Sequence, residues 1–121
     1  MHKILLVEDD MMVQIVTGGM LESLGCEVTI AGTGSEAIKT AIKNSYDIIL
    51  LDLGLPDLHG KDVSLRLRQH GIRTPIVALT GRTSEEEGHN CFDARMDDFL
   101  QKPASLDMLK FILNKHLSKV A

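Results

Sequence analysis

The chain of 121 residues has the length of one compact domain, and an apolar content of 44% excludes an intrinsically disordered chain. A formal net charge of −4, with Lys and Arg scattered along the chain, argues against a nucleic-acid-binding surface. No apolar stretch is long enough to span a bilayer and no signal-peptide pattern is present, so we expect one cytoplasmic domain over residues 1–121 that contacts neither nucleic acid nor membrane directly. Cys26 and Cys91 lack metal-ligand spacing and are expected to be buried free thiols.

The first predicted elements are a strand and a helix. Residues 3–7 are apolar after the first of them and predict a buried parallel strand. Residues 12–24 carry apolar side chains at helical spacing, and Gly25 then ends the predicted helix. The side chains expected to face inward are Val13, Val16, Met20 and Leu24.

The middle of the chain continues this alternation. Residues 27–31 are mixed in polarity and predict a less buried strand, residues 35–44 predict a helix, and residues 48–51 predict a buried strand. The apolar stripe of the helix is formed by two adjacent pairs, Ala37 with Ile38 and Ala41 with Ile42.

The segment 61–70 is ambiguous by periodicity alone. Val63, Leu65 and Leu67 alternate with polar residues, which is the spacing of a strand. The neighbouring strands look parallel and buried, however, and a parallel crossover normally needs a helix, so we predict a helix. The apolar run at residues 76–79 predicts the next buried strand.

The last predicted elements are a helix, a strand and a helix. Ser84 and Glu87 have the spacing of a capping box for a helix that runs to about Ala94. Residues 98–101 predict a strand of mixed polarity, and Ser105 caps the final helix. The final helix should turn inward Leu106, Leu109, Ile112, Leu113 and Leu117.

Five alternations of strand and helix predict an α/β fold with a parallel sheet between two layers of helices. In such sheets, ligands bind beyond the carboxyl ends of the strands. The polar residues that follow the predicted strands at this edge are Glu8, Asp9, Asp10, Asp52, Thr80 and Lys102.

These residue types suit phosphoryl transfer. Several carboxylates at one edge repel each other, and a hard divalent cation such as Mg²⁺, which prefers carboxylate and phosphate oxygens, removes that conflict. An aspartate such as Asp52 can attack phosphorus and carry an acyl phosphate. Lys102 and Thr80 would then stabilise the phosphoryl oxygens together with the metal.

Four segments together resemble a known family, and they are residues 4–10, 47–56, 78–81 and 101–103. Over nearly its whole length, the chain resembles the receiver domain of two-component response regulators, and it looks most like the receivers of hybrid sensor histidine kinases. The resemblance implies a flavodoxin-like three-layer sandwich, with a five-stranded parallel sheet in the order 2-1-3-4-5 and five helices.

The resemblance also implies roles for the acids. Asp52 would be the phosphoacceptor. Glu8 and Asp9 would form the acidic pair, with Asp9 as the direct Mg²⁺ ligand. Asp52 and the backbone carbonyl of Gly54 would complete the protein's share of the metal site.

A second group of roles concerns switching. Thr80 would rotate toward the phosphoryl group, and Lys102 would pair with it. Phe99 occupies the position of the switch aromatic, whose rotamer follows Thr80, although the residues alone are equally consistent with an edge aromatic. The resemblance further implies a cis peptide bond before Pro103.

Receivers of this kind take a phosphoryl group from a histidine kinase or exchange it with a histidine phosphotransfer domain, and they switch rather than turn over substrate. A homodimer is also possible, through the helix that carries residues 85–87, the strand at Phe99 and the last helix. An aspartyl phosphatase is disfavoured because Gly54 stands where a second acid is needed. A receiver-like binding module that takes no phosphate is disfavoured because the site residues are all present.

Several positions depart from the family pattern. Arg82 stands two residues past Thr80, where we expect it to shield the phosphoryl group from water. Arg95 replaces a common glycine at a helix end, where a positive φ angle would strain it mildly. His59 replaces a common aspartate without an evident catalytic role. Met12 and Ile15 are either scattered surface hydrophobes or, as we favour, part of a docking patch.

Overall fold

The computed structural model describes residues 1–81 and 94–117. Its strands are β1 (Lys3–Val7), β2 (Glu27–Ala31), β3 (Ile48–Asp52), β4 (Ile76–Thr80) and β5 (Asp98–Gln101). Its helices are α1 (Met11–Ser23), α2 (Gly34–Lys43), α3 (Gly60–Gln69) and α5 (Leu106–His116). The strands form one parallel sheet in the order β2-β1-β3-β4-β5. No helix in the described ranges is long and apolar enough to cross a membrane.

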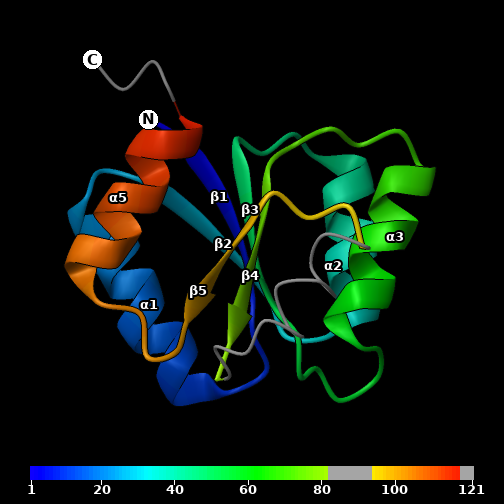
Figure 1. The fold of residues 1–121 in the computed structure, drawn as a ribbon, viewed down its shortest axis with the longest axis horizontal. Coiled ribbons are helices and arrows are strands. Elements are labelled where there is room, and N and C mark those ends of the chain that lie inside the picture. The colour runs from blue at the N-terminus through cyan, green and yellow to red at the C-terminus, as the bar shows by residue number, and fades with distance from the viewer. Residues whose placement is uncertain (82–93, 118–121) are drawn as a thin grey trace.

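The sheet lies between two helical layers, with α1 and α5 on one face and α2 and α3 on the other (Figure 1). Successive side chains of a strand point to opposite faces, so each central strand supplies both layers. In β1, Leu5 and Val7 pack toward α2 and α3, whereas Ile4 and Leu6 pack toward α1 and α5. All residues of β3 and β4 are buried, which explains their almost wholly apolar sequences.

The predicted sheet order and all five predicted strands are confirmed. The ambiguous segment at residues 61–70 is the helix α3, in which Val63 and Leu67 are fully buried. Cys26 is a buried free thiol, as predicted. The helix predicted between Ser84 and Ala94 falls almost wholly outside the described residues, as does Cys91.

Three side chains predicted to face inward are exposed instead, namely Val16, Ile42 and Leu106. In α1 the buried residues are Thr17, Gly18 and Leu21, so the inner face is turned by one position from the one predicted. The small Gly18 faces β2, where a Cβ would stand 3.9 Å from the Ile30 side chain. Large apolar residues are therefore left on the outer side of α1.

Each described helix begins at a side-chain cap that accepts a hydrogen bond from a backbone N–H of the first turn. The caps are Asp10 for α1, Thr33 for α2, His59 for α3 and Ser105 for α5. His59 Nδ1 accepts from the N–H of Lys61 at 3.0 Å, so this unusual residue has a structural role. Asp10 accepts from Val13 at 3.1 Å and is a cap rather than a member of the acidic site.

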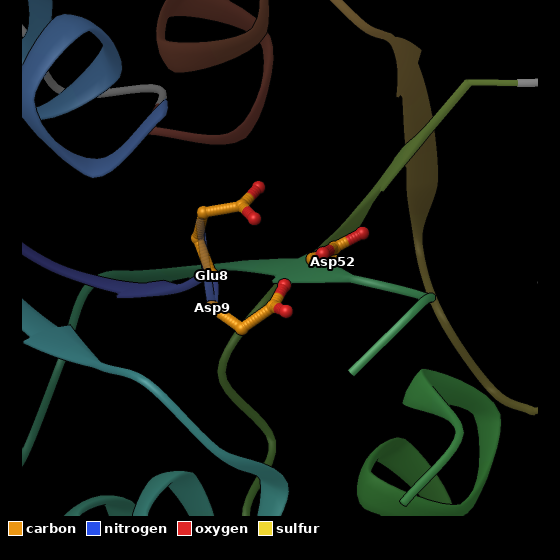
Figure 2. Close-up of side chains that lie close together, drawn as sticks. All are labelled: Glu8, Asp9 and Asp52. Carbon is orange, nitrogen blue, oxygen red and sulfur yellow. The ribbon is translucent and has the colours of Figure 1, made fainter. Parts of the chain in front are cut away.

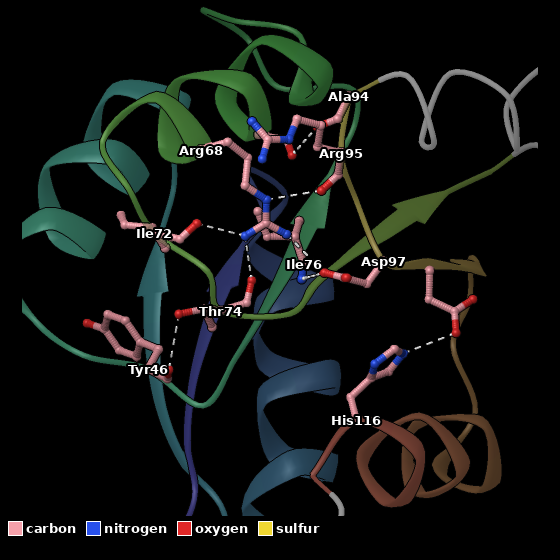
Figure 3. Close-up of polar contacts among 11 residues, drawn as sticks. Tyr46, Arg68, Ile72, Thr74, Ile76, Ala94, Arg95, Asp97 and His116 are labelled. Carbon is pink, nitrogen blue, oxygen red and sulfur yellow. Dashed lines mark hydrogen bonds and ion pairs between the residues drawn. The ribbon is translucent and has the colours of Figure 1, made fainter.

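At the amino end of β4, the guanidinium of Arg68 joins three segments of chain (Figure 3). It donates to the carbonyl oxygens of Ile72, Thr74 and Arg95 at 2.8–3.0 Å. It also forms an ion pair with Asp97 at 2.9 Å. Arg95 has a φ angle of 62°, the conformation that glycine favours, and its carbonyl accepts from Arg68.

Candidate functional site

The register of the sheet brings the ends of four strands together. The last residue of β1, Val7, pairs with the residue before Asp52, so Glu8 lies beside Asp52. Thr80 ends β4, and it pairs with the residue before Lys102 at the end of β5. The predicted convergence of these polar residues at one edge of the sheet is therefore observed.

Three carboxylates share a small space at this edge (Figure 2). One oxygen from each of Glu8, Asp9 and Asp52 can be chosen so that all three lie within 4.8 Å of one another. Glu8 is fully buried and Asp52 is 6% exposed, whereas Asp9 is open to solvent. The acidic cluster is thus shielded from solvent at Glu8 and Asp52 and accessible to solvent at Asp9.

The ammonium of Lys102 lies between two of these acids. Its Nζ is 2.7 Å from Glu8 Oε1 and 3.0 Å from Asp52 Oδ1. Burial alone would lower the pKa of Lys102, but the hydrogen bonds with Glu8 and Asp52 outweigh it, and the pKa is raised. Lys102 therefore stays charged, and its positive charge reduces the repulsion between the two buried carboxylates.

One ammonium does not balance the negative charge of three carboxylates. Burial raises the pKa of Glu8, and the charge of Asp52 acts in the same direction, although Lys102 and the N–H of Asp10 oppose it. The buried Glu8 Oε1 lies 2.7 Å from the Lys102 ammonium, which also contacts Asp52. Among the described residues, the excess of carboxylates around this ammonium fits a hard divalent cation.

The remaining predicted site residues lie around this cluster. The N–H of Gly54 donates to Asp52 Oδ1 at 3.2 Å, which places the start of the loop after β3 beside the acceptor carboxylate. Thr80 is 5% exposed, and its carbonyl accepts from the N–H of Lys102 at 2.7 Å. Phe99 is 37% exposed on β5 and pairs in register with a residue of β4.

Two further expectations concern the rim of the site. The Lys102-Pro103 peptide bond is cis, as the resemblance implied. Arg82 lies outside the described residues, so its predicted shielding role stays a prediction.

Three residues that support the site were missed from sequence. Gln14 on α1 donates through Nε2 to the carbonyl of Glu8 at 2.7 Å. Asp57 accepts three hydrogen bonds from the start of α2. Gly60 begins α3 directly against β3, where a Cβ would stand 2.8 Å from the carbonyl oxygen of Asp52. Only Gly60 left a signal in the sequence, as a glycine at the start of a predicted helix.

An apolar groove of about 360 Å³ adjoins the site, between α1 and the start of the connection to α5. Its lining residues are Met12, Val13, Val16, Thr17, Leu79, Lys102, Pro103 and Ala104. Met12 is 68% exposed, and Ile15 on the same helix is 62% exposed. The predicted apolar patch beside the acids is therefore present.

Comparison with known proteins agrees with this geometry. The family model of the response regulator receiver domain matches residues 4–114. The sensor histidine kinase RcsC of Salmonella typhimurium is 34% identical over 117 residues, which are 97% of this chain and 12% of RcsC. The transcription factor SKN7 of Candida albicans is 36% identical over 114 residues, which cover 94% of this chain and 20% of SKN7. The chain thus spans a small part of these curated relatives.

Among solved structures, the receiver domain of the sensor histidine kinase PA1611 from Pseudomonas aeruginosa has a TM-score of 0.90 and 38% identity, with 98% of each chain covered. That structure holds a magnesium ion in its active-site cleft. A two-component response regulator from Clostridium difficile has a TM-score of 0.92 and 28% identity, again over 98% of each chain. The parallel sheet, the strand-end residues and the family match together show that the chain belongs to the response regulator receiver family of two-component and phosphorelay systems.

Proposed function

We propose that this receiver accepts a phosphoryl group on Asp52 in a Mg²⁺-dependent reaction. One observation carries the proposal: the nearly buried carboxylate of Asp52 lies among two further carboxylates and 3.0 Å from the Lys102 ammonium. A single reactive aspartate beside one fixed cation and a surplus of acidic ligands is suited to hold a metal and a phosphoryl group together.

The residues for the metal are those predicted from the sequence. Asp9 and Asp52 would bind Mg²⁺ directly, Glu8 would complete the acidic pair, and the carbonyl of Gly54 would add a neutral oxygen ligand. When bound, the ion would neutralise charge on the phosphoryl oxygens. The buried oxygen of Glu8 and the close approach of the three acids support this assignment.

In the proposed reaction, a carboxylate oxygen of Asp52 forms a bond to phosphorus while the bond between phosphorus and the donor's histidine nitrogen breaks. The electron pair of that bond stays on the leaving imidazole, and Asp52 becomes an aspartyl phosphate. Lys102 would pair with a phosphoryl oxygen, and the hydroxyl of Thr80 would donate a hydrogen bond to another. The enzyme-like chemistry ends there, with one group accepted and no repeated turnover.

Thr80 and Phe99 would convert this event into a change of surface. Both lie on the adjacent strands β4 and β5, with Thr80 nearly buried at the site and Phe99 partly exposed at the sheet edge. Rotation of Thr80 toward the phosphoryl group would open space for Phe99 to turn inward. Nuclear magnetic resonance should detect a change in the environment of Phe99 when the unmodified protein is phosphorylated. A Thr80→Ala variant should still accept phosphate but should lose this change.

The partner in this proposal is a histidine kinase, a histidine phosphotransfer domain, or both in sequence. Its helices would pack on the exposed apolar side of α1, where Met12 lines the groove beside the site and Ile15 is exposed on the same helix. Ile15→Glu should slow phosphoryl transfer from a histidine donor but leave reaction with a small acyl phosphate unchanged. Ile42→Glu is the matched control, because Ile42 is 50% exposed on α2, in the opposite helical layer (Figure 1). Equal loss in both reactions would contradict docking on α1.

A homodimer is a second proposed assembly. Phe99 and Phe111 are 37% and 67% exposed and border one groove of about 320 Å³ between β5 and α5. Phosphorylation should then increase the mass measured by light scattering, and Phe111→Glu should abolish the increase. A mass that does not change on phosphorylation would exclude this dimer.

The proposed function is tested by intact-mass spectrometry after incubation with Mg²⁺ and a small acyl phosphate. We expect the mass of one phosphoryl group to be added, in a linkage stable to acid and labile to base. The gain should disappear with a chelator or in Asp52→Asn, and it should persist in Asp107→Asn, which removes an exposed acid from α5. An unchanged gain in Asp52→Asn would overturn the assignment.

A further inference from the structure

The loop between β3 and α3 carries Gly54, and contacts hold it both at its base and at its tip. At its base, Gly54 and His59 form an antiparallel bridge, and the N–H of Gly60 donates to the carbonyl of Leu53 at 3.0 Å. At its tip, the carboxylate of Asp57 accepts hydrogen bonds from the start of α2. The loop therefore has a defined shape, and its position relative to the site depends on the contact at the tip.

Asp57 is bound by three donors at the start of α2. Its Oδ1 accepts from the N–H of Gly34 at 2.8 Å, and its Oδ2 accepts from the N–H and the hydroxyl of Ser35 at 3.0 and 2.9 Å. These donors hold the pKa of the exposed Asp57 at about 2, with the Gly34 N–H as the largest contribution. The carboxylate also faces the positive end of the α2 dipole.

Helix capping alone does not explain this contact. The helix α2 already has its own cap, because Thr33 Oγ1 accepts from the N–H of Glu36 at 3.1 Å. Asp57 lies 22 or more residues away in the sequence and adds a link between two separate elements. The effect of Asp57 is therefore to place the loop against α2.

The packing around this link leaves little freedom. A Cβ at Gly34 would stand 2.9 Å from Val63 Cγ2 and 3.0 Å from Leu58 Cβ, so the start of α2 touches the loop and α3 closely. A Cβ at Gly60 would stand 2.8 Å from the carbonyl oxygen of Asp52. The close packing at Gly34 and Gly60, together with the hydrogen bonds of Asp57, thus confines the loop between α2 and the end of β3.

We propose that Asp57 is a positioning residue for the metal site, which fixes the loop after β3 so that the Gly54 carbonyl is held ready as a Mg²⁺ ligand. The inference rests on the proposed function. It adds that the affinity for Mg²⁺ depends on a carboxylate that does not itself bind the ion. Asp57 would act by attaching the loop to the start of α2. Supporting groups of this kind commonly change metal affinity by about tenfold or more.

Calorimetric titration of the unphosphorylated protein with Mg²⁺ alone tests the inference. Asp57→Ala should raise the Kd for Mg²⁺ about tenfold, and Asp57→Asn, whose amide oxygen keeps part of the contact, should lie between it and the unmodified protein. Ser35→Ala removes only the hydroxyl donor and should have a smaller effect. Asp62→Asn removes the same charge from the exposed first turn of α3 and should leave the Kd unchanged.

Amide hydrogen exchange without metal provides a second readout. The N–H groups of Gly34 and Ser35 should exchange faster in Asp57→Ala, as should the amides of the loop, whereas those of β3 should not. If Asp57→Ala does not fold, Asp57→Asn and Ser35→Ala still give the graded series.

The outcomes separate the two proposals. If the unmodified protein binds Mg²⁺ and Asp57→Ala binds it equally well, the positioning role is wrong and the proposed function stands. If Asp62→Asn weakens binding as much as Asp57→Asn, charge alone explains the effect and the positioning role is again wrong. No binding by the unmodified protein would overturn the proposed function and this inference with it.

Discussion

The two ends of the sheet differ in how far their charged side chains are paired with opposite charge. At the amino end of β4, Arg68 pairs with Asp97, and its other donors meet three backbone carbonyls (Figure 3). Asp97 in turn accepts from the N–H of Ile76 at 2.8 Å. At the carboxyl end, the carboxylates of Glu8, Asp9 and Asp52 lie close together (Figure 2), and the Lys102 ammonium contacts two of them, Glu8 and Asp52.

The difference distinguishes a network that stabilises the fold from a cluster that is suited to binding a ligand. A network in which one guanidinium donates to four acceptors and its charge is paired contributes to stability. A cluster with surplus negative charge gains from a further cation, which the described residues do not supply. Substitutions at the amino end should therefore change mainly the free energy of unfolding, whereas removal of an acid at the carboxyl end should change mainly binding and reactivity.

The largest expected effect on stability is that of Arg68→Ala. The substitution leaves three carbonyls and a carboxylate without their shared donor, which should lower the free energy of unfolding by about 2–4 kcal/mol. Arg68→Lys should recover little, because an ammonium lacks the planar fork that reaches all four acceptors. Urea unfolding followed by circular dichroism measures both. A loss below about 0.5 kcal/mol in Arg68→Ala would show that the network is not a source of stability.

Lys102→Met should come next. It removes the cation between the two buried acids, Glu8 and Asp52, and should lower the free energy of unfolding by about 1–3 kcal/mol in metal-free buffer. Addition of Mg²⁺ should restore part of this loss, because the ion supplies the missing positive charge. A loss that Mg²⁺ leaves unchanged would contradict a shared site for the metal and the lysine.

Asp52→Asn should have a still smaller effect on stability, within about 1 kcal/mol of the unmodified protein and in the direction of a gain, because it relieves repulsion among the acids. Urea unfolding in metal-free buffer measures this difference. The same variant should lose all phosphoryl acceptance. A loss of several kcal/mol in Asp52→Asn would show that the acidic cluster stabilises the fold, and would weaken the contrast between the two ends.

The smallest expected effect is the contribution of Asp57 to the pH dependence of stability. Asp57 lies at the carboxyl end of the sheet but, unlike the acidic cluster there, accepts three hydrogen bonds. Its pKa falls from 3.8 in the unfolded chain to about 2 in the folded protein. As the pH falls below 3.8 the unfolded state takes up the proton first, so this contribution to stability is lost between pH 3.8 and about 2. Above that range both states are ionised and the contribution is constant.

Parallel urea titrations of the unmodified protein and Asp57→Asn check this pH dependence. The difference in unfolding free energy between them should be constant near neutral pH and should shrink as the pH falls through this window. A difference that grows on acidification would contradict the assigned direction of the pKa shift.

The sequence predicted the site better than it predicted what supports the site. Asp52 and Lys102 follow short strand patterns, and the carboxyl ends of parallel strands meet at one edge, so their convergence follows from chain order alone. The anchoring of Asp57 was not predictable in this way, because its donors at Gly34 and Ser35 come from a distant turn. Arg68 left no signal either, since three of its four acceptors are backbone carbonyls.

The faces of the helices show a second limit. In α1 the periodic apolar residues suggested an inner face that included Val16, but Thr17 and Gly18 face the sheet instead. Small residues on a close-packed face are weak hydrophobic signals, and the large apolar residues beside them belong to the exposed surface. The same exposure is what makes α1 a candidate for docking.

The central claim is that one residue, Asp52, receives the phosphoryl group. The most direct measurement treats the protein with Mg²⁺ and an acyl phosphate, reduces the aspartyl phosphate with borohydride to homoserine, and locates the homoserine by peptide sequencing in a mass spectrometer. We expect homoserine at position 52 alone, and none when Mg²⁺ is withheld. Homoserine at Asp9 or at another acid, with Asp52 intact, would contradict it.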